Sequence, residues 1–354
     1  MDIKVYMQKN YKLLSLIGGL LAISCFLIGY FIVGYFSLIE FSQATAENDF
    51  LISAKRYTSS LDGQLVKTKN ETVSAVVGIM IETHPDARPM IGFSKAKIVY
   101  EAPVEGSFTR YLAIFDSKQN VPKIGPVRSA RPYFIDWLQE YGSGLYMHSG
   151  GSPEALSLIK SRNIFDANEF FWGEYYWREQ ARFAPHNLYT SSDNWKKILD
   201  EYGNNKERFG LAKAWKYTTI VGKTIASDSK LSIDFNSSYG VMWNYDPKSL
   251  LYVRSVNGSR EKDADGVGVS ARNVIVQFTD VKLIAGDDSG RRTVQTLGGG
   301  KAMVLKKGGI TTGTWEKKSL TDRTRFYDKN HREIFLAPGN TWVEVVPNEA
   351  KISG

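Results

Sequence analysis

No charged residue occurs between Leu13 and Ile39, and this uncharged run constrains the chain more than any other feature. A helix rises about 1.5 Å per residue, so a run of this length exceeds the roughly 30 Å hydrocarbon core of a bilayer. Lysines precede the run and acidic residues follow it, which predicts a cytoplasmic N-terminus. We therefore expect a cytoplasmic segment (1–12), one transmembrane signal anchor (13–39), and an extracytoplasmic remainder held at the cell membrane by the N-terminal helix.

A cleaved lipoprotein signal is the alternative interpretation of this segment. Ala22-Ile23-Ser24-Cys25 loosely matches a lipoprotein processing site, with a small residue before the cysteine. However, the apolar run continues through Val33, whereas a lipidated mature end is followed by polar residues. We favour the retained span, and lipidation of Cys25 stays the open alternative. Because Cys25 is the only cysteine, a disulfide framework and a thiolate zinc site are excluded.

The charge balance bears on possible partners. The net charge is +8, and most of the excess follows the apolar run. A basic exterior suits anionic partners such as wall polymers or lipid-linked glycans, although solubility alone would explain it equally well. The sequence has no lysine-rich run and no nucleic-acid motif, so we expect no nucleic-acid partner. The length of 354 residues suits about two domains.

The first half of the exterior part has the pattern of an α/β N-terminal globular domain (73–216), which follows a polar stalk (40–72). Continuous apolar runs with β-branched residues are typical of buried strands. They predict strands at 73–81, 96–102, 108–116 and 145–148. Helices are expected at 131–141, 153–162 and 194–202, the second with Ser152 as its N-cap.

A mostly antiparallel β C-terminal domain (226–350) is expected after a linker (217–225). Short apolar runs alternate there with turn signals such as Asn257-Gly258 and Asp265-Gly266. These runs predict strands at 231–235, 252–256, 273–278, 293–298, 302–306, 311–315, 325–327 and 341–346. The chain is thus expected to combine one transmembrane helix, an α/β domain and a β domain.

Two arginines three residues apart, Arg128 and Arg131, precede an expected helix. The planar guanidinium fork matches phosphate and carboxylate, and a helix N-terminus adds free N–H groups. We expect these arginines to form an anion site; the competing interpretation is two arginines in surface ion pairs. Gly150, Gly151 and Ser152 connect a strand to a helix, and their backbone N–H groups could approach the same anion.

A third arginine, Arg110, shares one face of its expected strand with apolar side chains. A charge among apolar neighbours needs a partner, and Glu101 and Glu105 are the nearest candidates. A structural ion pair and a polar cleft are both compatible with this pattern. The ligand-binding residues predicted from sequence are therefore Arg110, Arg128, Arg131, Gly150, Gly151 and Ser152.

One histidine, His148, ends an expected strand beside the glycine loop, a suitable position for a general base. If the protein is an enzyme, His148, Glu101 and Glu105 are the catalytic candidates. His84, His148 and Glu82 could in principle bind a metal, but no short ligand spacing supports such a site. We therefore expect no metal and no cofactor.

Several blocks of the sequence resemble the YerB-like lipoprotein family of Gram-positive and related bacteria. The resemblance covers about residues 73–350. It is specific in several blocks: 81–89, 94–101, 104–106 with 109–110, 123–132, 150–153, 184–190, 273–277, 298–302, 313–315, 324–328 and 338–345. It implies a two-domain, extracytoplasmic, membrane-attached protein, and it supplies no reaction. The uncleaved N-terminal span departs from the lipoprotein pattern.

Two functions follow as expectations. The first is a cell-envelope protein that binds or scaffolds an anionic wall polymer, a lipid-linked glycan or a partner protein. The second is an envelope hydrolase or transferase acting on a phosphodiester or glycan, with His148 as base, Glu101 or Glu105 as acid, and the arginines stabilising developing charge.

Overall fold

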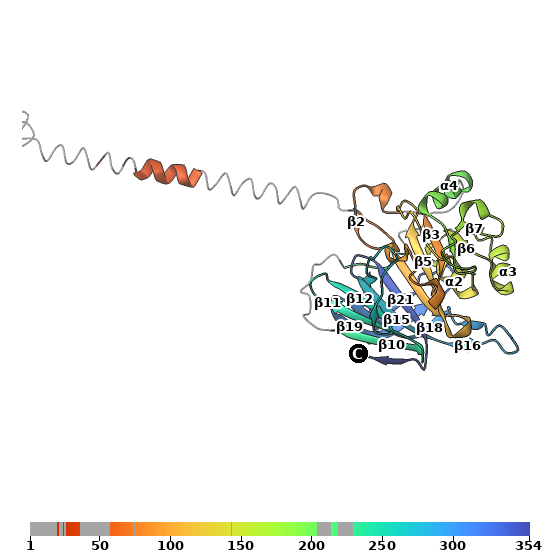
Figure 1. Cartoon of the computed structure of the whole chain (residues 1–354). Helices are drawn as coiled ribbons and strands as arrows, with labels where there is room; N and C mark the ends of the chain where they lie inside the picture. The colour runs from red at the N-terminus through yellow and green to blue at the C-terminus, as the bar shows by residue number, and fades with distance from the viewer. Residues whose placement is uncertain are drawn as a thin grey trace, which may run out of the picture. The chain divides into compact units, whose positions relative to one another are not determined.

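The computed structural model describes residues 20, 24, 26–35, 57–73, 75–142, 144–203, 214–218 and 229–354 (Figure 1). The chain forms two units, Met1–Arg56 and Tyr57–Gly354. In the first unit, residues 26–35 are helical. Within the described ranges, no helix is both long and apolar enough to cross a membrane. The remainder of the expected anchor (13–39), the segment 1–12, residues 40–56 of the stalk and most of the linker (217–225) lie outside the described residues.

The second unit is organised around one ten-stranded sheet. In spatial order its strands are β20 (Arg325–Asp328), β19 (Gly309–Lys317), β18 (Gly298–Lys306), β15 (Asn273–Thr279), β21 (Thr341–Pro347), β4 (Ile98–Pro103), β5 (Thr109–Asp116), β3 (Val76–Glu82), β6 (Leu145–His148) and β7 (Asp166–Asn168). β21 runs parallel to both β15 and β4, and β3, β6 and β7 are parallel to one another. The other neighbouring pairs are antiparallel.

Both faces of the central strands are buried, which explains their continuous apolar sequences. Successive side chains alternate between two cores because strand side chains have a period of two. On β3, Met80 belongs to the core that contains α2 (Pro132–Leu138) and α3 (Pro153–Ser161). Ile79 belongs to the other core, which contains α4 (Ser192–Tyr202) and the second sheet described below. On β21, Trp342 and Val343 divide between the two cores in the same way.

The second sheet is antiparallel and contains β13 (Ser259–Arg260), β12 (Leu251–Val256), β11 (Tyr239–Asp246), β10 (Lys230–Asn236) and β22 (Lys351–Ser353), with β14 (Ser270–Ala271) paired to β12. Three two-stranded pairs complete the strands: β1 (Tyr57–Thr58) with β2 (Leu65–Val66), β8 (Trp177–Arg178) with β9 (Leu188–Tyr189), and β16 (Val281–Leu283) with β17 (Arg292–Val294). One long strand, β11, was not expected from the sequence.

Three α-helices cover the large sheet: α2 (Pro132–Leu138), α3 (Pro153–Ser161) and α4 (Ser192–Tyr202). α3 begins as predicted, because the Ser152 side chain accepts a hydrogen bond from the Ala155 N–H. Short 3₁₀ turns lie at η1 (Lys69–Glu71), η2 (Pro85–Ala87), η3 (Phe93–Lys95), η4 (Glu105–Ser107), η5 (Gln139–Tyr141) and η6 (Gly173–Tyr175).

The expected fold class needs correction at two points. The described chain is mostly β with few helices, so an α/β description overstates the helical content of its first half. The two halves also share the ten-stranded sheet, in which β21 from the C-terminal half pairs with β4 from the N-terminal half. Sequence periodicity identified both strands but carries no information on which strand pairs with which across such a separation.

Candidate functional site

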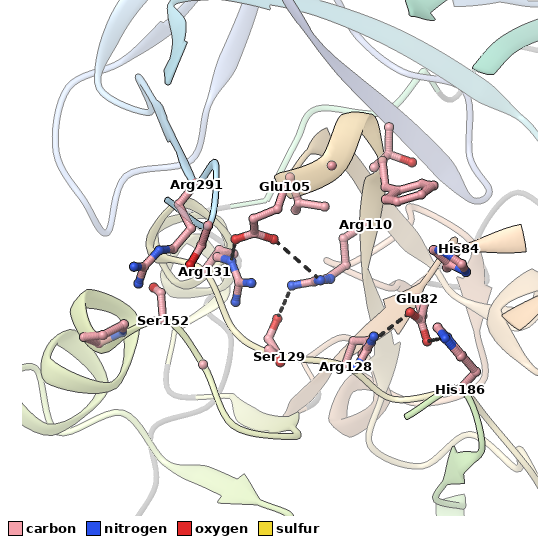
Figure 2. A pocket seen from close by; sticks show the side chains of 17 residues that line it. Glu82, His84, Glu105, Arg110, Arg128, Ser129, Arg131, Ser152, His186 and Arg291 are labelled. Carbon is pink, nitrogen blue, oxygen red and sulfur yellow. Dashed lines mark hydrogen bonds and ion pairs between the residues drawn. The ribbon is translucent and has the colours of Figure 1, made fainter. Parts of the chain in front are cut away.

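A cavity of about 560 Å³ opens where β3 ends and β5 begins (Figure 2). Its walls include η4, the segment before α2, the first residues of α3 and the loop before β9. Its charged lining consists of four arginines and two glutamates: Arg110, Arg128, Arg131, Arg291, Glu82 and Glu105. Two histidines, His84 and His186, also line it. Such a volume suits a small ligand or one sugar-sized unit of a larger one.

Glu105 lies between two of the arginines. Its Oε1 accepts a short hydrogen bond from Arg131 Nε, and its Oε2 is 3.9 Å from Arg110 Nη2 (Figure 2). Burial alone would raise the pKa of Glu105, but Arg131 and Arg110 outweigh it and hold the pKa below its ordinary value. Glu105 is therefore ionised, and one carboxylate serves two guanidinium groups.

Arg110 is the most buried of these arginines, with 9% of its surface exposed. Its Nη1 donates to the Ser129 carbonyl at 2.9 Å. Burial and the positive charge of Arg131 together lower the pKa of Arg110 to about 10, and Glu105 restores only part of the decrease. The charged form is thus destabilised where it lies, and a bound anion would relieve that repulsion.

Glu82 connects the third arginine to a histidine. Its Oε1 is 2.9 Å from Arg128 Nε, and its Oε2 is 3.0 Å from His186 Nδ1 (Figure 2). Glu82 is only 4% exposed, and the buried Oε2 and Nδ1 atoms are close without being aligned for a hydrogen bond. The carboxylate therefore pairs with Arg128 and faces an imidazole at the cavity wall.

The fourth arginine comes from the C-terminal half of the chain. Arg291 lies between β16 and β17, and its Nε is 2.6 Å from Asp287 Oδ2. Counting Asp287 with Glu82 and Glu105, four guanidinium groups face three carboxylates, so one positive charge is unmatched. The unmatched charge lies at Arg110 and Arg131, which share Glu105.

The glycine loop lies partly at this cavity. Gly151 and Ser152 line it, and Gly150 is not among its lining residues. The Gly150 N–H donates to Asn168 Oδ1 at 2.8 Å, and the Ser152 N–H donates to the Ala130 carbonyl. These two amides stabilise the loop itself, so the arginine side chains are the main candidates for anion binding that line the cavity.

His148 lies elsewhere. Its ring is fully buried, with Nδ1 2.7 Å from the Gly150 carbonyl and Nε2 3.1 Å from Asp166 Oδ2. Both ring nitrogens thus have protein partners, and His148 does not line the cavity. The position at the end of β6 was predicted correctly, but the geometry gives the ring a structural role and does not favour a general base.

Glu101 does not line the cavity either, although its hydrogen-bond partner Thr109 does. It is fully buried, accepts hydrogen bonds from the Thr109 hydroxyl at 2.6 Å and the Tyr239 hydroxyl at 2.8 Å, and forms a short ion pair with Arg254. Arg110 therefore pairs with Glu105 rather than Glu101. Glu101 is surrounded by protein groups, which does not favour its use as a catalytic acid.

Sequence reasoning brought Arg110, Arg128, Arg131, Gly151 and Ser152 to one cavity, and their roles in binding stay predictions. It missed Glu82, His186 and Arg291 as members of the site. Antiparallel pairing of β3 with β5 places Glu82 directly opposite Arg110, but strand periodicity does not predict that pairing. No sequence signal places the loop that carries His186 either.

Comparisons with known proteins agree with this architecture. Residues 61–205 match the family model described as "Protein of unknown function (DUF3048) N-terminal domain", and residues 231–343 match the corresponding C-terminal domain. The chain is 32% identical over 302 residues to the Bacillus subtilis (strain 168) protein named "Putative lipoprotein YerB", covering 84% of this chain and 88% of that protein. It is also similar to the crystal structure of YerB from Bacillus subtilis, with a TM-score of 0.73, 31% identity, and coverage of 84% of this chain and 99% of the solved one.

Proposed function

Because this chain belongs to the YerB-like DUF3048 family, we propose that it is a membrane-associated envelope protein whose exterior unit binds an anionic ligand in the arginine-lined cavity. The lipoprotein name of its relative supports the location outside the membrane. The ligand-binding role rests on the geometry of the cavity, since the family supplies no reaction.

The observation that carries the proposal is the shared carboxylate. Arg110 and Arg131 both pair with Glu105, and burial with Arg131 lowers the pKa of Arg110 to about 10. A protein gains nothing in stability from crowding two buried guanidinium groups around one carboxylate. A phosphate or carboxylate placed between them would supply the missing negative charge through charge-assisted hydrogen bonds.

The proposed ligand is a phosphate- or carboxylate-bearing unit of a wall polymer or lipid-linked glycan. The cavity volume of about 560 Å³ accommodates one such unit rather than a long segment. The basic net charge of +8 would add attraction at longer range. An enzymatic role based on His148 is not favoured, because its ring is buried away from the cavity.

Isothermal titration calorimetry of the full-length chain with inorganic phosphate, glycerol phosphate and glucuronate tests the binding role. Arg131→Gln removes one of the two crowded guanidinium groups, and we expect at least a tenfold loss of affinity for the anion that binds. One hydrogen bond to a charged group contributes about 1.5–3 kcal/mol, which corresponds to a loss of that size.

Arg162→Gln is the matched control. Arg162 has a similarly covered side chain and one carboxylate partner, Asp136, but does not line the cavity. It should bind like the wild type. Equal weakening by both variants, or no binding of any of the three anions by the wild type, would reject the cavity as an anion site.

Attachment to the membrane is the second part of the proposal. The uncharged run 13–39 supports a retained N-terminal span, and lipidation of Cys25 is its alternative. Metabolic labelling with a fatty-acid analogue separates them. The retained span predicts an unlabelled, membrane-bound protein of full length, whereas a labelled chain shortened to Cys25 would replace the anchor with a lipid.

A further inference from the structure

A group of metal-ligating side chains lies at the rim of the arginine-lined cavity. His84 follows β3 and caps η2, where its Nδ1 accepts the Asp86 N–H at 3.2 Å. The His84 ring stacks on the His186 ring, with centroids 4.7 Å apart and an interplanar angle of 21°. Asp86 Oδ2 is 3.6 Å from His84 Nδ1 and 4.0 Å from His186 Nε2. Two imidazoles and a carboxylate thus converge from two separate segments.

A second observation points to a ligand at this group. Glu82 is only 4% exposed, and its Oε2 forms a 3.0 Å ion-pair contact with His186 Nδ1 (Figure 2). These two buried atoms have no aligned hydrogen bond. The negative charge of a carboxylate 3.0 Å away favours a proton on Nδ1, which leaves Nε2, 4.0 Å from Asp86 Oδ2, as the nitrogen available to a metal. Metal-binding histidines are oriented in this way by carboxylates outside the coordination sphere.

We propose that His84, Asp86 and His186 bind one divalent transition-metal ion of the zinc class, with Glu82 as the positioning residue for His186. Two imidazole nitrogens and one carboxylate oxygen favour zinc and its neighbours over magnesium or calcium, which prefer oxygen ligands. The three ligand atoms all lie within 4.8 Å of one another. Bonds of about 2.1 Å to one zinc ion bring donors within about 4 Å of one another, so binding requires the stacked imidazoles to rotate.

No metal was expected from the sequence, in which His84 was considered as a ligand only together with His148 and Glu82. His84 and Asp86 lie two residues apart, but His186 comes from a loop before β9 and is far along the chain. A site with three protein ligands leaves a coordination position open. Since His84 and His186 line the cavity, that position would face the space in which the arginines lie.

The metal site and the arginines share one carboxylate. Glu82 contacts His186 through Oε2 and Arg128 through Oε1 at 2.9 Å. Positive charge added at the metal would therefore weaken the attraction of Glu82 for Arg128. An anionic oxygen in the cavity could contact both the metal and Arg128. The metal assignment itself does not depend on the anion, because its three protein ligands all come from His84, Asp86 and His186.

Zinc titration of the chelator-treated full-length chain, in competition with a chromophoric chelator and without added anion, tests the proposal. We expect one zinc ion per chain. His84→Ala and His186→Ala should each weaken binding at least tenfold, and Glu82→Gln should weaken it less while altering the visible spectrum of the cobalt(II)-substituted protein. Circular dichroism melting identifies any variant that does not fold.

His331→Ala is the matched control, because His331 stacks on Tyr327 outside this group and should retain wild-type zinc affinity. The wild-type cobalt(II) spectrum should lack a thiolate charge-transfer band, since Cys25 takes no part. The proposal is overturned if the wild type binds no zinc with one-to-one stoichiometry, or if folded His84→Ala and His186→Ala bind zinc like the wild type. Neither result depends on whether the cavity binds anions.

Discussion

Buried charges hold the two sheets together at the residue scale. Arg254 is fully buried and pairs with Glu101 and Glu261, while its Nε lies 3.7 Å from Glu344 Oε1. Parallel pairing of β21 with β4 places Glu344 directly beside Glu101. Two neighbouring carboxylates in a buried site cannot both be ionised without cost, so one of them retains its proton.

Glu344 is the carboxyl group that retains the proton. Burial raises its pKa well above the ordinary 4.5, and Glu101 adds to the increase. Above about pH 4.5, Glu344 loses its proton in the unfolded state but keeps it in the folded state. The contribution of Glu344 to the free energy of unfolding is therefore fully present at low pH and is lost as the pH rises to the folded pKa.

We predict that Glu344→Gln removes this loss. The glutamine carbonyl can still accept the hydrogen bond that Trp243 Nε1 donates to Glu344 at 2.8 Å. Between pH 5 and the folded pKa, the stability of the wild type should fall relative to the variant by up to about 1.4 kcal/mol per pH unit. Urea unfolding at a series of pH values measures the difference, and parallel curves for the two proteins would contradict the assignment.

Local reasoning about residues found positions correctly where the groups are close in sequence. Arg128 and Arg131 both line the cavity, while their joint role in binding stays a prediction. Glu105, which pairs with Arg110, was among the partners considered for it. Glu101 could not be assigned, because its partner Arg254 lies 153 residues away. The same limit concealed His186, whose contact with Glu82 depends on how loops meet after the sheet has formed.

At the scale of elements, periodicity predicted most of the long strands and all three α-helices. β6 was predicted with its observed bounds, and the N-cap of α3 was correct. β11 was missed although Val241, Trp243 and Tyr245 alternate as buried positions along it. The order of strands in the sheet could not be predicted. The two-residue periodicity of side chains indicates which face of a strand is buried, but not which strand lies beside it.

Gly300 on β18 leaves room for the Trp315 indole of β19 to donate a hydrogen bond to the Phe278 carbonyl of β15. A Cβ at Gly300 would lie 2.6 Å from the Phe278 carbonyl oxygen and 2.6 Å from Trp315 Nε1, between groups joined by a 2.7 Å hydrogen bond. We predict that Gly300→Ala destabilises the protein by about 1–3 kcal/mol, because the extra methyl group must displace the indole.

Gly173→Ala provides the comparison, since a Cβ at Gly173 meets nothing within 4 Å. It should change stability by less than about 0.5 kcal/mol, as exposed substitutions do. Guanidinium unfolding of both variants measures the contrast, and similar midpoints for the two would show that the β18–β19 contact tolerates the methyl group.

At the scale of the whole molecule, two family domains form one structural unit. The family models divide the chain between residues 205 and 231, yet Tyr57–Gly354 is one compact unit. Within it, β21 of the C-terminal domain pairs with β4 of the N-terminal domain. We predict one cooperative thermal transition for this unit, because neither half completes the large sheet alone.

Deleting residues 341–354 should abolish that transition, including the circular dichroism signal of the N-terminal half, because β4 and β15 would both lose β21. Deleting only 351–354 removes β22 from the edge of the second sheet and should preserve the transition at a lower temperature. Two separate calorimetric peaks for the intact chain would show instead that the halves unfold independently.

The late position of β21 affects the timing of folding during synthesis. β4 ends at Pro103, but the neighbour that covers one of its edges begins at Thr341, near the end of the chain. An uncovered strand edge can pair with other chains, and such distant contacts form slowly. Fragments from interrupted translation would keep this edge exposed, so chaperones and proteases could recognise an unfinished chain by the absence of its last long strand.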